Sequence, residues 1–166
     1  IVYHKGLNGG TNPQNYFMRL NTTVAESSNT TRWNDTAPNN TYFTLGDTVL
    51  VNENTKYFIA MLFASIEGVS KVGYYSGSNS SQTISLGFAP RFVLLKNIDA
   101  GEYWYLGDSV RGLDNRLAIN NANAQSTMTG TGGVPWLQAT SSGVTIIGNE
   151  LTVNKSGSNY IYYAHA

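Results

Sequence analysis

One stretch of the sequence occurs twice, and this recurrence limits what the chain can fold into. Val51–Ala64 (VNENTKYFIAMLFA) returns as Val153–Ala166 (VNKSGSNYIYYAHA) at a spacing of 102 residues. Each copy has Val-Asn, a polar turn and an aromatic-rich apolar run that ends on Ala. A recurrence at a fixed spacing indicates a repeat architecture, and it has to be identified before any single element is interpreted.

Further matches extend the repeat over most of the chain. Trp104-Tyr105 takes the place of Val2-Tyr3. At a spacing of 99 residues, Leu117–Asn121 takes the place of Met18–Thr22. We therefore interpret the chain as one complete and one partial copy of a unit of roughly 100 residues.

The local patterns of both units predict strands. Short runs of β-branched and aromatic residues alternate with clusters of Gly, Ser and Asn, and no stretch of twelve residues is amphipathic at the helical period. The sequence predicts an all-β fold of tandem, antiparallel β-sandwich units that are jelly-roll-like. Residues 1–66 form the partial first unit, and residues 67–166 form the complete second unit.

Two segments carry the strongest strand predictions. Tyr57–Ala64 is short, apolar and flanked by turn residues, which favours a strand buried on both faces. Gly68–Phe88 has a Gly/Ser/Asn cluster between two alternating runs, which predicts a hairpin. Further strands are expected within Ile1–Lys5, Tyr16–Asn21, Tyr42–Val51, Arg91–Asn97, Tyr103–Leu106, Gly143–Ile147, Leu151–Val153 and Tyr160–Ala166.

The first unit lacks a counterpart of Gly68–Gly101. The missing strands either precede this segment in a parent chain or are supplied by a neighbour. An unpaired apolar strand is an aggregation hazard, so we expect Tyr57–Ala64 to be paired somewhere.

Composition excludes several classes of chemistry. The chain has no Cys, which removes disulfides, zinc–thiolate sites and thiol catalysis. Its net charge is +0, so charge alone does not attract it to nucleic acid or an anionic membrane. The longest apolar run, Tyr57–Ala64, is far shorter than the ~20 residues of a spanning helix. We therefore expect neither nucleic-acid binding nor membrane insertion.

The titratable residues form no recognisable catalytic pattern. His4 and His165 lie far from acidic residues in sequence; we expect His4 at the surface and His165 packed. The carboxylates that could form a glycosidase pair sit beside Gly or in polar stretches, where turn roles are commoner. They are Glu67, Asp99, Glu102, Asp108 and Asp114. We predict no enzyme, no catalytic residue, no metal and no cofactor.

Aromatic residues are the best candidates for recognition. Trp33 and Trp136 fall in loops, where an indole can stack on a sugar or contact a receptor. The aromatics inside strand patterns are expected to fill the core and its rims. They are Tyr74, Tyr75, Tyr103, Trp104, Tyr162 and Tyr163.

An ordered series of motifs resembles a known family. The series comprises Gly68–Ile84, Gly87-Phe88, Pro90–Lys96, Trp104 and Asp108–Gly112, preceded by Val2–Leu7, Leu20–Thr23, Trp33–Pro38 and Ala60–Ala64. It is similar to the repeated β-rich domain of large virion proteins of tailed bacteriophages, notably marine ones. The resemblance covers nearly the whole chain. It implies a structural protein of the tail or its fibres, and it carries over no activity and no catalytic residues.

The repeat, the strand density and this resemblance lead to the first hypothesis. The chain is a tail fibre or tail appendage module, located in the virion, that serves assembly and host-surface attachment. It predicts a homo-oligomer, a trimer in our expectation, that contacts other virion proteins and a host glycan or receptor. The nearest alternatives are a capsid decoration or head-fibre protein and a carbohydrate-binding module. A glycan-cleaving tail enzyme and a self-assembling filament are weaker ones.

Overall fold

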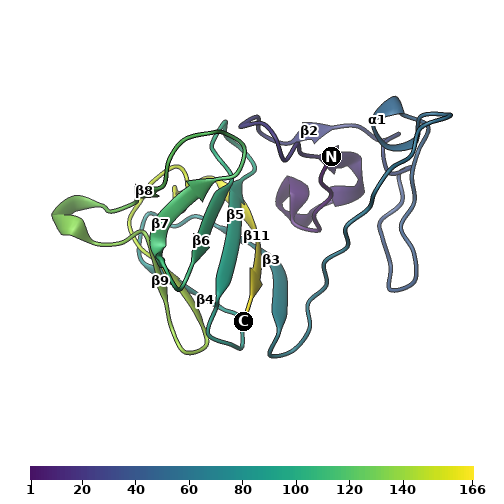
Figure 1. Cartoon of the computed structure of the whole chain (residues 1–166). Coiled ribbons are helices and arrows are strands. Elements are labelled where there is room, and N and C mark those ends of the chain that lie inside the picture. The colour runs from purple at the N-terminus through teal and green to yellow at the C-terminus, as the bar shows by residue number, and fades with distance from the viewer.

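Two antiparallel sheets built from the second part of the chain face each other across an apolar core. The computed structural model describes residues 1–166. The larger sheet has six strands in the order β3-β11-β5-β6-β7-β8, and the smaller has three in the order β4-β10-β9 (Figure 1). Their bounds are β3 Ser70–Ser76, β4 Gln82–Ser85, β5 Phe92–Asn97, β6 Tyr105–Asp108, β7 Gly112–Ala118, β8 Ser126–Thr127, β9 Leu137–Ala139, β10 Gly143–Ile146 and β11 Asn159–His165. The predicted all-β class is confirmed, and the arrangement is compatible with a β-sandwich.

The last strand, β11, lies in the middle of the larger sheet. It pairs with β3 from Asn159↔Ser76 to His165↔Ser70, and with β5 from Tyr160↔Asn97 to His165↔Phe92. Both of its edges are therefore hydrogen-bonded. Its side chains alternate between the two faces of the sheet. Tyr160, Tyr162 and Ala164 point into the sandwich, whereas Ile161 packs on the opposite face.

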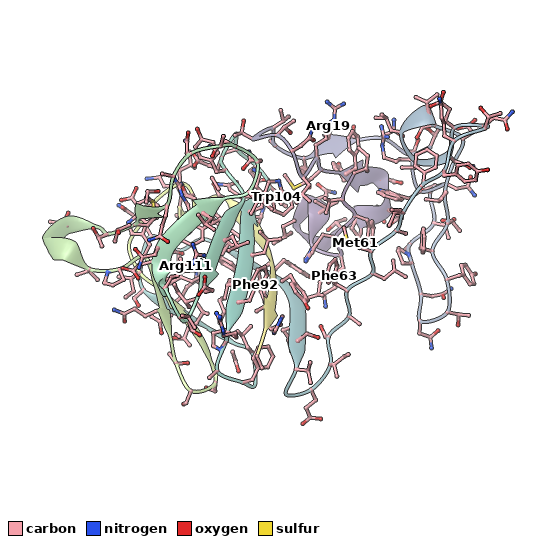
Figure 2. The ribbon with its side chains drawn as sticks, in the orientation of Figure 1. Arg19, Met61, Phe63, Phe92, Trp104 and Arg111 are labelled. Carbon is pink, nitrogen blue, oxygen red and sulfur yellow. The ribbon has the colours of Figure 1, made fainter.

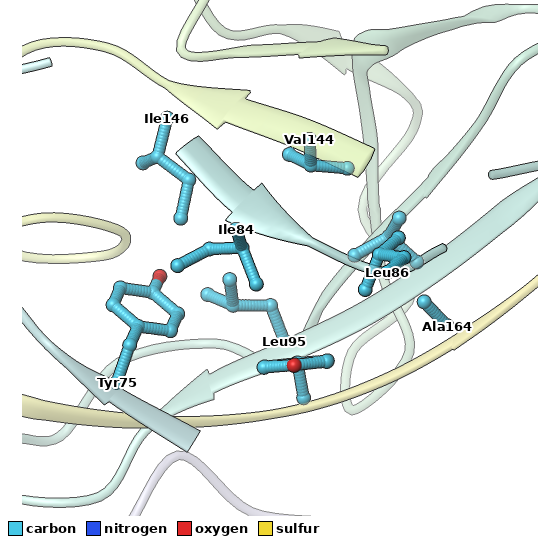
Figure 3. Close-up of a pocket in the computed structure, with 9 residues that line it drawn as sticks. Tyr75, Ile84, Leu86, Leu95, Val144, Ile146 and Ala164 are labelled. Atoms are coloured by element: carbon cyan, nitrogen blue, oxygen red, sulfur yellow. The ribbon is translucent and has the colours of Figure 1, made fainter. Parts of the chain in front are cut away.

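The sandwich core is apolar and closely packed. Fourteen buried residues from both sheets form one cluster, in which the Tyr75 and Tyr160 rings stack with centroids 4.9 Å apart and planes 11° apart. Figure 3 shows Tyr75 and Leu95 of the larger sheet facing Ile84 and Ile146 of the smaller one. Burial of such side chains contributes ~1.5–3 kcal/mol each, so this cluster is the main source of stability.

The first part of the chain contains little regular structure. Its elements are the 3₁₀ turns η1 Leu7–Gly10 and η2 Pro13–Asn15, the short strands β1 Tyr16–Phe17 and β2 Ser27–Ser28, and the helical turn α1 Val49–Asn52. A further 3₁₀ turn, η3 Thr131–Gly133, belongs to a loop of the second part. Leu7 and Met18 pack against Ile98, Trp104 and Ile161 on the outer face of the larger sheet. The first part is thus attached to the sandwich by a second, smaller core.

Several strand predictions were wrong, most of them in the first part. Ile1–Lys5 contributes only Val2 of the isolated bridge Val2↔Met18, and Tyr16–Asn21 contributes β1 and the Met18 side of that bridge. Tyr42–Val51 contains no strand and ends in α1. Leu151–Val153, in the second part, forms a turn. Strand patterns become strands only where a partner satisfies the backbone, and these runs have few partners.

The predicted hairpin Gly68–Phe88 was also wrong in its pairing. Its two runs do form β3 and β4, but these strands lie in different sheets, where β3 pairs with β11 and β4 with β10. The Gly/Ser/Asn cluster between them therefore crosses from one layer to the other. A polar turn between two alternating runs marks a change of direction and does not by itself specify the partner.

The two parts share backbone geometry at the spacings seen in the sequence. The pairs Tyr16↔Ser28 and Phe17↔Ser27 recur 99 residues later as Asn115↔Thr127 and Arg116↔Ser126.

A second correspondence has a spacing of 102 residues. The amides of Val51 and Asn52 donate to the carbonyl of Thr48, and those of Val153 and Asn154 donate to the carbonyl of Glu150. The repeat is therefore visible in hydrogen bonds as well as in residue types.

Candidate functional site

Trp33 is held inside the first part of the chain. Only 8% of its surface is exposed, its Nε1 donates to the carbonyl of Tyr16 at 2.9 Å, and its ring meets Tyr3 edge-on at 5.8 Å. Phe17 and Val51 complete the cluster around it. A buried indole offers no face to a sugar, so the structure places Trp33 as a core anchor of the first part.

Trp136 lies immediately before β9 and is half-buried. It packs against the edge of the sandwich core, and its Nε1 has no hydrogen-bond partner. Its backbone amide donates to Met128 at the base of the loop that contains η3. Of the two candidate tryptophans, Trp136 is therefore the one with part of its ring at the surface. The structure does not bring Trp33 and Trp136 into one site.

The interior of the sandwich has no room for a ligand. The space between the sheets is a cavity of ≈ 10 Å³ lined by nine hydrophobic residues, several of which are drawn in Figure 3. A single water needs about 10–15 Å³ and several polar partners. The candidate functional surfaces therefore lie outside the sandwich core.

Four of the five candidate carboxylates lie in turns and loops or at their edges, and Asp114 lies within β7. Asp99 accepts from the amide of Asn159 at 2.6 Å, and Glu102 accepts from the hydroxyl of Thr152 at 2.7 Å. Glu67 lies in an exposed turn before β3. No group of three or more His, Asp or Glu side chains is placed to hold a metal ion.

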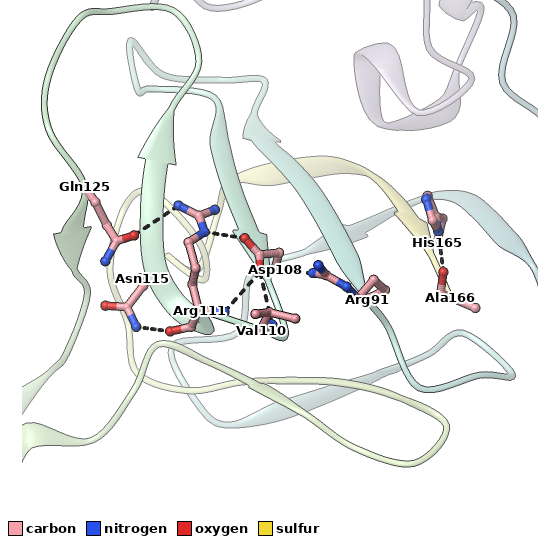
Figure 4. A network of polar contacts seen from close by, with 8 residues as sticks. All are labelled: Arg91, Asp108, Val110, Arg111, Asn115, Gln125, His165 and Ala166. Carbon is pink, nitrogen blue, oxygen red and sulfur yellow. Dashed lines mark hydrogen bonds and ion pairs between the residues drawn. The ribbon is translucent and has the colours of Figure 1, made fainter.

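Asp108 is the centre of a network at the turn between β6 and β7. It accepts from the amides of Val110 and Arg111 and forms ion pairs with the side chains of Arg91 and Arg111 (Figure 4). These donors, first of all the Arg111 amide, lower the pKa of Asp108 to about 2. Gly112 follows at φ +95°, a conformation that favours glycine. The motif Asp108–Gly112 is thus explained as the bonding pattern of a turn.

The two histidines differ from their predicted placement. His4 was expected at the surface, but it is half-buried between the first part and β11. Its Nε2 lies 3.3 Å from the carbonyl of Tyr162, and its Nδ1 accepts from the amide of Gly6 at 2.9 Å. Burial lowers the pKa of His4 to about 4. His165, the last residue of β11, was expected to pack, but it is exposed. Its ring lies near the ring of Phe92.

A lysine that no sequence pattern singles out is fully buried. Lys96 lies on β5, and its Nζ donates to the carbonyls of Asn97 at 2.5 Å and Ala100 at 3.1 Å. Burial lowers its pKa to about 8. Its donors are directed at the turn that follows β5, so its visible role is to hold that turn. Nothing in the local pattern of β5 distinguishes Lys96 from a lysine on an exposed face.

The largest correction concerns Tyr57–Ala64. This run was predicted to be a doubly buried strand, yet it forms no strand, and its side chains are exposed, with 94% of Ile59 and 74% each of Met61 and Leu62 accessible. No hydrogen bond joins the backbone of Tyr57–Phe63 to the rest of the molecule. The physical reason is that the strands which flank its counterpart β11 have no counterparts beside it.

Comparison with known proteins gives a family for the chain. A family model described as Domain of unknown function (DUF7483) matches residues 1–166. The chain belongs to this family. No curated protein and no solved structure matches it. The DUF7483 description names no activity, so function has to be argued from the residues.

One polar depression lies on the first part of this DUF7483 domain, beside the Trp33 cluster. Its lining comprises Thr30, Thr31, Asn34, Asp35, Leu45, Gly46, Asp47 and Asn52. Asn34 and Asp35 both adopt positive φ, which places them in a tight turn. None of the helical turns of the domain has the length and hydropathy that crossing a membrane requires.

Proposed function

We propose that the chain is a structural module of a tailed-bacteriophage virion, in a tail fibre or tail appendage, where it serves assembly and host-surface attachment. The observation that carries the proposal is the repeat. Two parts of one chain share their sequence motifs and also local backbone geometry at the same spacings. Tandem β-units of this kind suit an elongated particle protein, because each unit contacts mainly its neighbours.

The motifs behind the resemblance have structural roles in the molecule. Asp108, Arg111 and Gly112 hold the turn between β6 and β7, and Phe92–Lys96 forms most of β5. Residues with such roles are those that a repeat must keep in order to fold. This supports a module selected for architecture, with attachment assigned to its loops.

The proposed partners are other copies of the chain, as a trimer, and further virion proteins. A host glycan or receptor would meet the loops at the end of the sandwich, with Trp136 as the first candidate contact. Light scattering on the purified chain measures the oligomer directly. A stable trimer is the expected result, and a monomer at all concentrations would contradict the oligomeric part of the proposal.

Immunogold labelling tests the location in the particle. Antibodies against the purified chain are applied to intact particles of the phage that encodes it, and the same antibodies absorbed with the chain serve as the control. Label along the tail or its fibres is expected. Label on the head would favour a capsid decoration or head-fibre protein, and particles without label would overturn the virion assignment.

A carbohydrate-binding module is the second candidate, favoured by the partly exposed side chain of Trp136. Binding to a glycan array is measured for the parent chain, Trp136→Phe and Trp136→Ala. A stacking site predicts binding by the parent and by Trp136→Phe, and loss of at least tenfold in Trp136→Ala. No binding across the array would remove this candidate.

A further inference from the structure

The exposed run Tyr57–Phe63 has the composition of a core strand. In Figure 1 it belongs to the long uncoiled stretch between α1 and β3. One aromatic contact attaches it to the sandwich, between the rings of Phe63 and Tyr163 at 4.9 Å. Figure 2 shows Met61 and Phe63 along this stretch, outside the sheets. A run of exposed apolar residues of this length requires an explanation, because such surfaces mark interaction sites.

The same molecule contains the paired form of this run. The turn that leads into it recurs 102 residues later: the amide of Lys56 donates to the carbonyl of Glu53, as that of Ser158 donates to Lys155. Thr55 and Gly157 occupy corresponding positions and both have positive φ, 67° and 84°. The two turns therefore have the same backbone conformation. After the second turn the chain becomes β11.

The partners of β11 identify what the first copy lacks. β11 pairs with β3 on one side and with β5 on the other, and β4 joins the opposite sheet by pairing with β10. These three strands come from one contiguous run, Ser70–Asn97. A single segment therefore supplies both neighbours of β11 and also one strand, β4, of the opposite sheet.

Two asparagines point independently to the same missing segment. Asn154 is fully buried: its Oδ1 accepts from the Ser78 amide and the Gln82 side chain, and its Nδ2 donates to the carbonyls of Ser80 and Gly148. Three of these four partners lie within Ser70–Asn97. The counterpart, Asn52, is exposed, and its side chain makes no hydrogen bond.

We propose that Tyr57–Phe63 is a strand-acceptor site that binds the β3–β4–β5 segment of a further unit of the same repeat. The incoming segment adds an antiparallel strand to each edge of Tyr57–Phe63, in the register that β3 and β5 have with β11. Phe58 and Leu62 then point into a new sandwich core, as Tyr160 and Ala164 do in the second unit. Main-chain hydrogen bonds provide the affinity, and the alternating side chains provide the specificity.

A second copy of this chain is a poor occupant, because its own Ser70–Asn97 is already paired with its own β11. Donating that segment would expose Tyr160, Ile161 and Ala164 of the donor, which are buried. The exchange would create one complete unit by dismantling another. The segment must therefore come from a unit that has no β11 of its own to complete.

Amide hydrogen exchange on an extended chain tests the proposal, which stands whether or not the virion assignment holds. A copy of residues 68–102 is fused ahead of Ile1, where the 102-residue spacing places it in register without a linker. In the unextended chain, Tyr57–Phe63 is expected to exchange at the rate of unstructured peptide. In the extended chain its exchange should slow at least 100-fold and approach that of β11, the reference within the same molecule.

The matched control carries Val93→Asp and Leu95→Asp in the added copy only, which breaks the new strand without altering the parent residues. It should leave Tyr57–Phe63 unprotected and β11 protected. Rapid exchange at Tyr57–Phe63 in the unmodified extension, with β11 protected, would overturn the proposal. Protection already present in the unextended chain would overturn it as well. In the extended chain, protection of Tyr57–Phe63 that rises with protein concentration would identify a second copy as the occupant. Protection that is the same at every concentration would show that the added segment pairs within its own chain.

Discussion

Asn154 shows how much the surroundings of one residue type differ between the two parts. Its amide group has four hydrogen bonds in a fully buried position, whereas Asn52, which follows Val51 in the same local turn, is exposed. A buried amide is tolerated only when its donors and acceptors are satisfied. The recurrence of Val-Asn in the sequence marks both positions, but only the fold shows which amide is bonded.

Asn154→Ala is predicted to lower the free energy of unfolding by about 3 kcal/mol, because it leaves the Ser80 and Gly148 carbonyls and the Ser78 amide without a partner. Asn52→Ala is the matched control and should change it by less than about 0.5 kcal/mol. Urea denaturation followed by circular dichroism measures both. Equal losses in the two variants would contradict the different environments of these asparagines.

At the scale of elements, identical local patterns have different outcomes because strands depend on partners. β11 is the copy of the repeated run that forms a strand, because β3 and β5 pair with both of its edges. The copy that begins at Tyr57 has the same entry turn and no neighbours. The entry turn is therefore a local property of the sequence, and the strand that follows is a property of the sheet.

The entry turn itself can be tested at Gly157. Its φ is +84° and no atom lies near the position of an added Cβ, so a substitution there meets backbone strain alone. Gly157→Thr, which copies Thr55, is predicted to lower the free energy of unfolding by about 1–2 kcal/mol. The reciprocal Thr55→Gly should not lower it. Thermal denaturation compares the pair, and a Gly157→Thr protein as stable as the parent would show that this turn relaxes.

At the scale of the whole molecule, the first part is attached to the sandwich by the cluster of Leu7, Met18, Ile98, Trp104 and Ile161. His4 lies at the same junction, between Gly6 and the carbonyl of Tyr162 in β11. With Nδ1 accepting a hydrogen bond, the neutral ring donates from Nε2. Protonation places a second N–H against the amide of Gly6, so the charged form is disfavoured at this junction.

The stability of the molecule should therefore fall as the pH is lowered from about 6.5 to about 4. The pKa of His4 is lowered to about 4 from an unfolded value of about 6.5, so the unfolded chain binds the extra proton in this window. Inside this window the expected loss is about 1.4 kcal/mol per pH unit, and above pH 6.5 both states carry a neutral His4, so the stabilisation is complete and no longer varies with pH. It is measured as the difference in urea stability between the parent and His4→Gln across this range. A difference that does not vary with pH would contradict the buried, neutral ring.

The candidate site was only partly predictable. The sequence identified Trp136 and Trp33 as loop aromatics, but not that Trp33 would be closed in by Tyr3, Phe17 and Val51. Burial of a loop residue depends on segments distant in sequence, which local composition does not report. Nor did any pattern single out Lys96, whose partners are carbonyls in its own following turn.

The sequence by itself determined the all-β class, the strands β5 and β11 and the polar turn that precedes each copy of the repeated run, because strand alternation and turn chemistry act over a few residues. Only the tertiary structure decided that β3 and β4 enter different sheets and that Tyr57–Phe63 lies open while β11 is enclosed. Those outcomes depend on which distant strand is present to pair. The free energy of a strand comes from its neighbours, and a sequence pattern specifies the strand without specifying the neighbour.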